Sequence, residues 1–348
     1  MKNILRIWTI NLFLIGPFVF DSNALENQVS YAALFEATCQ LIEKNFYKPS
    51  FIQKTFNNKN IMYPTIGIIT ETIDNHIFIA SVLSGSNAEQ AGLLCGDEII
   101  AVNGSPFEPI NSLKENIWKQ VTFSIKRSPN ENIQSFIVTP SLVNPKTEML
   151  EAEKSSIRLI ETQGKKIGYI HIYSYAGQEY QDELISAFSQ GALKDADALI
   201  IDLRYGLGGA DPSYLNIFNP NIPIISSKDT SGNTSVYDPQ WRRPTVFLVN
   251  KASRSGKEIL VFGAKKYKLA TIIGERTAGA VLGARLFPLF NGDFLYLACR
   301  SSLIDGVDLE GIGVAPDIEV SMDIRYCEGK DIQIEKALEF LADTLRSQ

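Results

Sequence analysis

The chain has 348 residues, of which 45% are hydrophobic and 21% charged, and its formal net charge is -6. This balance is typical of a globular protein with enough length for two or three domains. The negative net charge argues against nucleic acid as the main partner.

The N-terminus is typical of a secretory signal peptide over residues 1–24. Lys2 and Arg6 precede the apolar run Ile7–Phe20, and the small residues Ser22–Ala24 follow it. A retained membrane anchor is the alternative, although the run is short for a bilayer span. No later segment is apolar enough to span a membrane. We therefore expect an exported protein, periplasmic or secreted, without a stable membrane span.

The cysteines have no spacing typical of a metal site. An exported protein could form one disulfide, but the sequence does not assign its partners. The candidates are Cys39, Cys95, Cys299 and Cys327.

Apolar residues recur near helical spacing in residues 25–60, which predicts a short N-terminal helical segment. Residues 61–140 are β-rich instead, with strand-like runs at Ile66–Thr70 and Ile77–Val82. Further strands are expected within Trp118–Arg127 and Ile133–Thr139. Residues 140–161 are interpreted as a polar linker.

Residues 84–104, SGSNAEQAGLLCGDEIIAVNG, combine a short helix, a Gly-Asp turn, an apolar strand and an Asn-Gly turn. This pattern resembles a PDZ domain. PDZ domains bind an extended peptide, often a free C-terminus, by strand addition. The resemblance implies a peptide-binding edge along Gly67, Ile68 and Ile69. The alternative is a β-module that only packs against its neighbour.

From Lys165 the pattern becomes α/β. Strands are expected at Ile167–Tyr173 and Ala198–Leu203, with an amphipathic helix at Tyr180–Gln190 between them. The run Ala198–Leu203 is apolar throughout, as in buried parallel sheets. Asp202–Gly209 follows with three glycines, which would let backbone amides approach a ligand closely. A plain strand-to-helix turn is the alternative.

Val246–Leu260 is interpreted as a buried strand, a polar turn and the start of a helix. A serine in such a turn can be a nucleophile beside backbone oxyanion donors. The alternative is that Ser253 or Ser255 only caps the helix. Strands are expected again at Ala270–Ile273 and Phe294–Cys299, and a C-terminal helix within residues 326–348.

The ordered set KIGYIHI, IDLRYGLGGA, VNKASRSGKEIL, IIGERTAGA and LEGIGVAPDIEV resembles the carboxyl-terminal processing (tail-specific) serine peptidases and the tricorn protease core. This resemblance implies a ClpP/crotonase-like α/β core over residues 155–325, a PDZ domain over 61–140, and no metal or organic cofactor. It further implies peptide or protein substrates, recognised through a free C-terminus.

The resemblance also assigns site residues. It places the nucleophile at Ser255, with one oxyanion donor from the Gly256 amide. The second donor would come from Gly208, or from Gly209 if the register slips. Glu310 matches a glutamate that supports the base in the tricorn-like pattern.

The general base does not follow from the resemblance. The processing peptidases carry a lysine where this chain has Ala280, and residues 25–60 lack the tricorn-type histidine. Three substitutes are considered. Lys257 would point away from Ser255 if both were helical, which predicts solvent exposure. His171 lies in an apolar strand that runs toward the site, where a buried structural histidine is the alternative. His76 would require the PDZ hairpin to dock over the cleft.

The sequence therefore predicts an exported serine peptidase acting through an acyl-enzyme on Ser255. A catalytically dead pseudopeptidase that binds peptides is the rival, supported by the missing lysine. A crotonase-type acyl-CoA enzyme could share the core, but the signal peptide and the PDZ pattern argue against it. The oligomeric state is not predicted.

Overall fold

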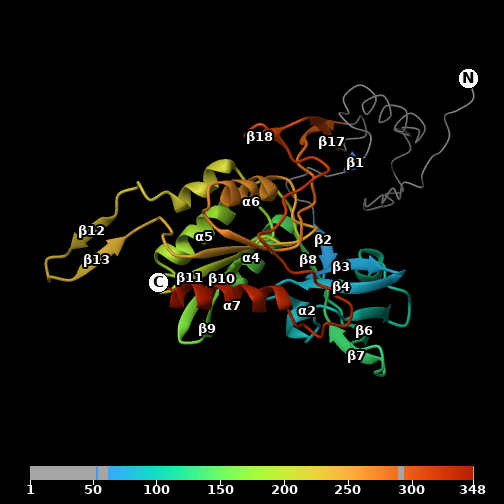
Figure 1. Ribbon diagram of the computed structural model, residues 1–348. Helices are drawn as coiled ribbons and strands as arrows, with labels where there is room; N and C mark the ends of the chain where they lie inside the picture. Colours follow the sequence, from blue (N-terminus) through green and yellow to red (C-terminus); the bar gives the residue numbers. More distant parts are fainter. Residues whose placement is uncertain (1–51, 54–61, 289–293, 348) are drawn as a thin grey trace, which may run out of the picture.

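The computed structural model describes residues 52–53, 62–288 and 294–347 (Figure 1). The expected signal peptide lies outside the described residues, as does most of the expected N-terminal helical segment. Within that segment, Ile52–Gln53 form strand β1 and pair with a strand near the other end of the chain. At these two residues the helical prediction was wrong.

A five-stranded antiparallel sheet carries the PDZ pattern, in the order β3-β4-β5-β6-β7. The alternating buried residues of β6 and the short helices α2 and α3 enclose its core. The elements are β3 (Ile68–Ile73), β4 (His76–Val82), α2 (Asn87–Gln90), β5 (Glu98–Val102), α3 (Asn111–Lys114), β6 (Val121–Lys126) and β7 (Gln134–Val138). Strand β3 lies at the edge of the sheet.

Residues 140–161 are not a linker, and that prediction was wrong. Strand β8 (Ser141–Val143) pairs with β2 (Tyr63–Thr65), and helix α4 (Pro145–Ser156) follows at once. Asn144 caps α4 by accepting from the Lys146 amide, and Pro145 occupies the first turn, where its missing N–H is tolerated. Few apolar residues mark this helix, so the periodic signal was weak.

The second unit is built on a six-stranded sheet in the order β20-β15-β14-β11-β10-β9, parallel except for β9. Its central strands β11 and β14 are buried at every residue, as their uninterrupted apolar runs predict. The strands are β9 (Arg158–Thr162), β10 (Lys165–His171), β11 (Ala198–Asp202), β14 (Thr245–Val249), β15 (Thr271–Gly274) and β20 (Ile318–Glu319).

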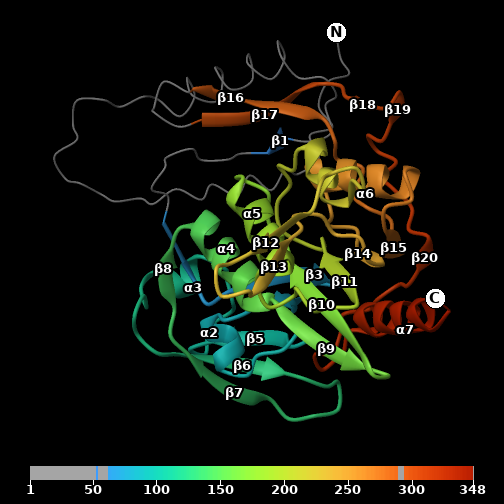
Figure 2. The ribbon, with the colours of Figure 1, turned by 90° about the vertical axis from the view of Figure 1, so that its left-hand side faces the viewer.

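Helices cover both faces of this sheet (Figures 1 and 2). Alternate strand residues pack either against α4, α5, η1 and α6 or against α7 alone. The bounds are α5 (Glu179–Ser189), η1 (Pro212–Phe218), α6 (Gly256–Lys266) and α7 (Ile332–Arg346). The result is a three-layered α/β core beside a β-rich PDZ unit, which confirms the predicted fold class.

Smaller elements lie outside the core. The exposed hairpin of β12 (Ile225–Lys228) and β13 (Thr234–Tyr237) projects from it in Figure 1. Strand β17 (Phe294–Arg300) pairs with β1 on one side and with β16 (Gly283–Pro288) on the other, and β18 (Leu303–Ile304) pairs with β19 (Val307–Asp308). Among the described residues, no helix is long and apolar enough to cross a membrane.

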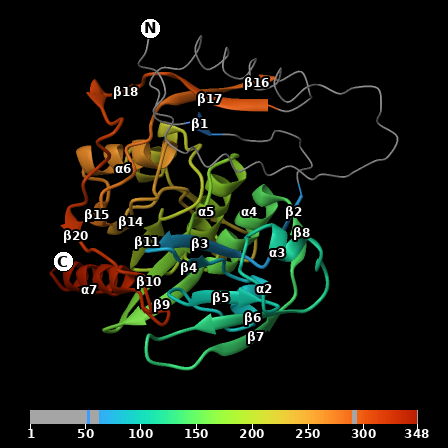
Figure 3. The same ribbon diagram turned by 90° about the vertical axis from the view of Figure 1, so that its right-hand side faces the viewer.

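The segment before α7 packs against the PDZ sheet (Figure 3). The ring of Tyr326 meets that of Phe78 edge-on, with centroids 5.2 Å apart. Its hydroxyl donates to the nearly buried carboxylate of Glu98, and its amide donates to the Gly96 carbonyl at 3.0 Å. The PDZ unit is therefore in direct contact with the segment that leads into α7 of the α/β core.

Candidate active site

Ser255 is the residue directly before helix α6, at the C-terminal edge of the parallel sheet. Its backbone adopts φ 57° and ψ -129°, a conformation that non-glycine residues rarely take. Such strain concentrates at functional sites, where the surrounding structure holds a side chain in a required direction. The hydroxyl is half-buried at the positive end of the α6 dipole.

The glycine turn after β11 lies directly against Ser255. A Cβ atom added to Gly208 would lie 2.5 Å from the Ser255 Cβ and 3.0 Å from its Oγ, so only glycine fits there. Gly256 is equally restricted, because an added Cβ would lie 2.3 Å from the Ala210 nitrogen. The structure thus brings Gly208 and Gly256, the two expected oxyanion donors, close to the serine.

The glycine turn is held by the end of β10. The Tyr175 amide donates to the Gly208 carbonyl at 3.0 Å, and the Leu207 amide donates to the Tyr173 carbonyl at 2.7 Å. Within the part of the chain that the structure describes, the Gly208 amide has no protein acceptor. This arrangement leaves an N–H donor available beside the serine, as an oxyanion hole requires.

Glu258 organises the other side of the serine. Its buried carboxylate accepts from the Ser255 amide at 3.1 Å and the Ala280 amide at 2.8 Å. It also accepts from the Gly279 amide at 2.7 Å and the Thr277 hydroxyl at 2.6 Å. Glu258 thus ties the start of α6 to the segment after β15. A glutamate three residues after a helix N-cap was the available signal.

Glu310 is also bound to backbone. Its Oε2 accepts from the Val281 amide at 2.8 Å and the Leu282 amide at 3.2 Å. No described contact joins it to a histidine or a lysine. The carboxylate therefore positions the segment that follows Ala280, and a role in supporting a base is not visible in this arrangement.

Lys257 is completely buried, so the expectation that it is exposed was wrong. Because Ser255 lies at positive φ outside the helix, the helical rotation of 100° per residue does not give the angle between the Ser255 and Lys257 side chains. The Lys257 amine donates to the Tyr205 carbonyl at 2.8 Å and the Tyr173 carbonyl at 3.2 Å. It therefore lies beneath the glycine turn and holds it to the end of β10.

Burial also changes the chemistry of Lys257. Loss of hydration lowers the pKa of its amine to about 7, against the opposing attraction of Asp202 and Glu153. A fraction of the amine is therefore neutral near pH 7. This is the pKa range that suits a general base.

His171 is buried, in agreement with its structural interpretation. Its Nε2 lies 2.9 Å from the Arg204 carbonyl oxygen, which fixes Nε2 as the protonated nitrogen, and its ring stacks on Tyr173. Burial lowers the pKa of His171 to about 4, so the ring is neutral above that pH. Asp202 Oδ2 lies 3.8 Å from the other ring nitrogen. Among the described contacts none joins His171 to Ser255.

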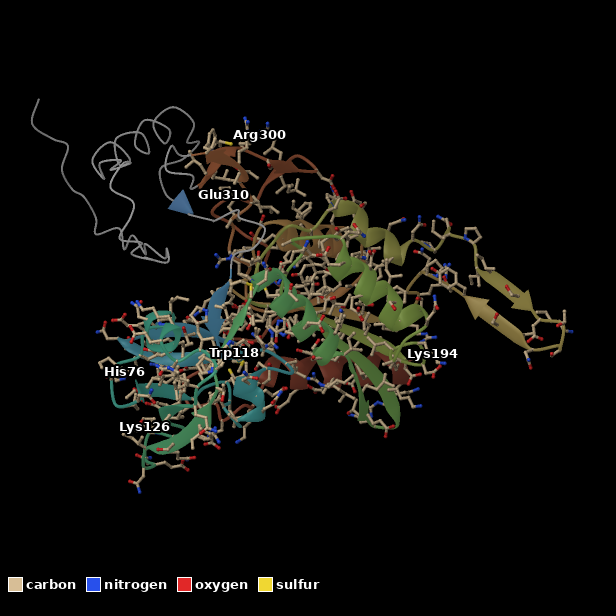
Figure 4. The ribbon with its side chains drawn as sticks, turned by 180° about the vertical axis from the view of Figure 1, so that it is seen from behind. His76, Trp118, Lys126, Lys194, Arg300 and Glu310 are labelled. Atoms are coloured by element: carbon tan, nitrogen blue, oxygen red, sulfur yellow. The ribbon has the colours of Figure 1, made fainter. Side chains whose placement is uncertain are left out.

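His76 lies on the PDZ unit, paired with the carboxylate of Glu98. In Figure 4 it is far from Glu310, which lies beside the outer strands of the core. The structure therefore does not bring His76 to the candidate site.

No proton acceptor contacts the serine in the described structure. The Ser255 side chain and Glu258 form a capping box at the start of α6, and none of the described bonds has the Ser255 hydroxyl as donor to a base. The family lysine position is occupied by Ala280, whose carbonyl accepts from the Ser255 amide at 3.0 Å. Nor do the described histidine, cysteine and carboxylate side chains form a cluster that could hold a metal ion. The candidate site thus has a serine with a strained backbone and nearby backbone N–H donors, but no described side chain stands where a general base would contact the serine.

The expected peptide-binding residues lie at the edge strand of the PDZ sheet and its entry. Gly67 lines a cavity of about 460 Å³ between the PDZ unit and α4. Its amide already donates to Thr65 Oγ1 at 2.8 Å. Ile68 packs into the PDZ core, whereas Ile69 packs toward Tyr173 of the peptidase core.

Comparison with known proteins decides the family. Residues 166–320 match the profile described as peptidase family S41, and residues 78–115 match that of a PDZ domain. The core belongs to peptidase family S41. The predicted resemblance is thereby confirmed, together with membership of a serine-peptidase family.

Two curated relatives of this chain have carboxyl-terminal processing in their names. The Carboxyl-terminal-processing protease of Synechocystis sp. is 28% identical over 79% of this chain and 67% of its own length. Carboxyl-terminal-processing peptidase 3, chloroplastic, of Arabidopsis thaliana is 23% identical over 72% of this chain and 52% of its own length. The chain thus spans between half and two thirds of these relatives.

A solved structure shares the fold of this chain. The putative S41 protease from Bacteroides fragilis is 17% identical and superposes with a TM-score of 0.55, covering 85% of this chain and 87% of that one. At this identity the similarity shows the fold alone.

Proposed function

We propose that this chain is an exported serine peptidase that hydrolyses peptides or C-terminal protein segments through an acyl-enzyme on Ser255. The observation that carries the proposal is the strained Ser255 backbone beside the Gly208 turn. A hydroxyl held in this way at a helix N-terminus, with free amides around it, suits attack on a carbonyl. Export rests on the N-terminal sequence pattern alone.

In the proposed reaction, Ser255 Oγ attacks the carbonyl carbon and the oxyanion accepts from the Gly208 and Gly256 amides. Glu258 keeps the serine backbone in its strained conformation through the Ser255 amide. The scissile C–N bond then breaks, and the amine leaves with the proton that Ser255 gave up, which leaves the acyl group as an ester on Oγ. Water hydrolyses this ester, releases the carboxylic acid and restores the hydroxyl.

The reaction requires a group that accepts the hydroxyl proton. Of the two candidates, Lys257 is the better match in pKa, at about 7 against about 4 for His171. Its amine would have to exchange a carbonyl partner for the serine hydroxyl. Glu310 acts in this scheme as a positioning residue through the Val281 and Leu282 amides.

A second function is favoured by one observation: among the described contacts the Ser255 hydroxyl donates to no base, and the adjoining position 280 is alanine. On this alternative the chain is a pseudopeptidase that binds peptides through its PDZ edge and releases them uncut. The partner in either function is a peptide or protein with a free C-terminus.

Labelling with a fluorophosphonate distinguishes the two functions. A peptidase should be modified at Ser255, found by peptide mapping, and the Ser255→Ala variant should be inert. Folded wild-type protein that binds peptides but resists the reagent would establish the pseudopeptidase instead.

A further inference from the structure

Two cysteines from distant parts of the chain meet where the PDZ unit contacts the segment before α7. The Sγ atoms of Cys95 and Cys327 lie 3.7 Å apart, across 232 positions of sequence, and both residues are half-buried. Cys95 belongs to the turn between α2 and β5, and Cys327 to the segment that leads into α7. We propose that Cys95 and Cys327 are a modification site whose disulfide cross-links the PDZ unit to the peptidase core.

The backbone holds this pair in register on both sides. The Gly329 amide donates to the Cys95 carbonyl at 2.9 Å, and the Tyr326 amide donates to the Gly96 carbonyl at 3.0 Å. An added Cβ on Gly96 would lie 2.5 Å from the Cys327 nitrogen, so the two segments are in direct contact. A disulfide needs the sulfur atoms at about 2.0 Å and the Cα atoms within about 7 Å. The sulfur atoms at 3.7 Å are therefore less than about 2 Å farther apart than in a disulfide.

The surroundings also favour the thiol chemistry. The interaction between the two sulfur atoms lowers the pKa of Cys327, aided by the Gly329 amide, whereas the same interaction and burial raise the pKa of Cys95. Cys327 is therefore the residue that forms a thiolate first. Thiolates are the nucleophiles in disulfide exchange.

The cross-link forms by exchange with an external disulfide oxidant. The Cys327 thiolate attacks one sulfur of the oxidant, forms a mixed disulfide and expels the other half as a thiolate. Cys95 loses its proton and attacks the Cys327 sulfur, which expels the second half. The two protein thiols thus lose two electrons and two protons, and the oxidant is reduced to two thiols.

The bond would act on the contact between the two units. In the reduced protein that contact depends on Tyr326 against Phe78, with the amide bonds beside the cysteines. A covalent link closes a loop of more than 200 residues and removes freedom from the open and unfolded states. Oxidation therefore holds the PDZ unit against the core, whether or not the core turns over substrate.

The test uses the full chain with Cys39→Ser and Cys299→Ser, which leaves only the proposed pair. This protein is incubated with oxidised glutathione, denatured, and its free thiols are counted with a maleimide and intact mass. We expect both thiols to disappear with the loss of two hydrogen atoms, and a peptide that joins residues 95 and 327. Adding Cys95→Ser or Cys327→Ser should leave one thiol free or glutathionylated. Persistence of both thiols, or only glutathione adducts, would overturn the pairing.

A second measurement tests the effect on the contact. Amide hydrogen exchange of residues 322–331 should slow on oxidation, and the melting temperature should rise by several degrees. Both changes should reverse on reduction and be absent when Cys95 is serine. If the cross-link forms and neither quantity changes, the pair does not hold the two units together.

Discussion

The backbone amide of Ser255 donates to the carbonyl oxygen of Ala280 at 3.0 Å, so position 280 adjoins the candidate nucleophile. The Ala280 amide in turn donates to Glu258, which also binds the Ser255 amide. Three residues thus share one hydrogen-bonded frame. In the processing peptidases that this chain resembles, position 280 carries the general-base lysine, and here a methyl group takes its place.

The Ala280→Lys variant should therefore gain reactivity. A lysine on this backbone starts beside the serine, and a positioned base contributes about 10²–10⁴-fold to proton transfer. We expect fluorophosphonate labelling of Ser255 to accelerate by at least about tenfold. Ala280→Met is the matched control, with similar length and no amine. Equal labelling rates in the two variants would show that the hydrogen bonds among Ser255, Glu258 and residue 280 do not direct the side chain at position 280 toward the Ser255 hydroxyl.

Ser255→Ala and Ser253→Ala should separate chemistry from stability. Ser255 Oγ serves the fold only as part of a helix capping box, so its removal should abolish labelling and cost at most about 1 kcal/mol. Ser253 is buried, donates to the Leu203 carbonyl at 3.0 Å and accepts from the Asn250 amide at 3.1 Å. Its loss leaves both groups unpaired and should cost about 1–3 kcal/mol.

Urea denaturation and labelling of both serine variants check this pair of expectations. A Ser253→Ala protein that is as stable as wild type but inert would assign the nucleophile to Ser253 and shift the register of the turn.

The sequence predicted the parts of this structure that depend on regular patterns. The uninterrupted apolar runs of β11 and β14 and the amphipathic helix α7 are present near their expected bounds. It missed α4, whose only clear signal was Asn144 before Pro145. It also misplaced Lys257, because one residue at positive φ changes the direction of the following side chain and no periodicity encodes that angle. Tertiary contacts, not local pattern, decide which charged groups are buried.

Lys257→Met should show whether Lys257 is a base or only holds the glycine turn. A base with a pKa of about 7 must be deprotonated to act, so labelling of wild type should rise with pH through about 7. Loss of this inflection in Lys257→Met would identify the base. A slower reaction with the same inflection would mean that the amine only positions the turn.

His171→Gln is the companion variant. With its pKa of about 4, His171 is neutral throughout the range above pH 5 and cannot produce an inflection near 7. Its ring stacks on Tyr173 and bonds the Arg204 carbonyl, so we expect a lower melting temperature. Loss of turnover with an unchanged melting temperature would instead support the imidazole as base.

The PDZ edge should prefer a free carboxylate. Peptides with a free C-terminus should bind the inactive Ser255→Ala chain about tenfold more tightly than amidated ones, since charge-assisted bonds are stronger. Gly67→Ala should remove this preference, because its Cβ would lie 2.2 Å from the Ser86 Cβ. Gly104→Ala, also at positive φ but in open space, controls for backbone strain. Equal affinity for both peptide forms in titration calorimetry would argue against this edge as a carboxylate site.

Glu153 should make the protein less stable as the pH rises. It is fully buried on α4, and neither of its carboxylate oxygens has a described hydrogen-bond partner. Burial, with repulsion from Glu183, raises the pKa of Glu153 to about 9, against the opposing effect of Lys257. The folded state therefore keeps a proton that the unfolded state releases above about pH 4.5.

Between those two pKa values the free energy of unfolding should fall with pH, by up to about 1.4 kcal/mol per unit. Glu153→Gln keeps the shape of the protonated acid without titrating, so its stability should exceed that of wild type increasingly from about pH 5 to pH 8.5. Lys257 titrates in both proteins and contributes to both curves. Urea denaturation across this range gives the difference, and Glu151→Gln on the exposed side of α4 is the matched control. Parallel curves for wild type and Glu153→Gln would mean that the Glu153 carboxylate is hydrated or paired in solution.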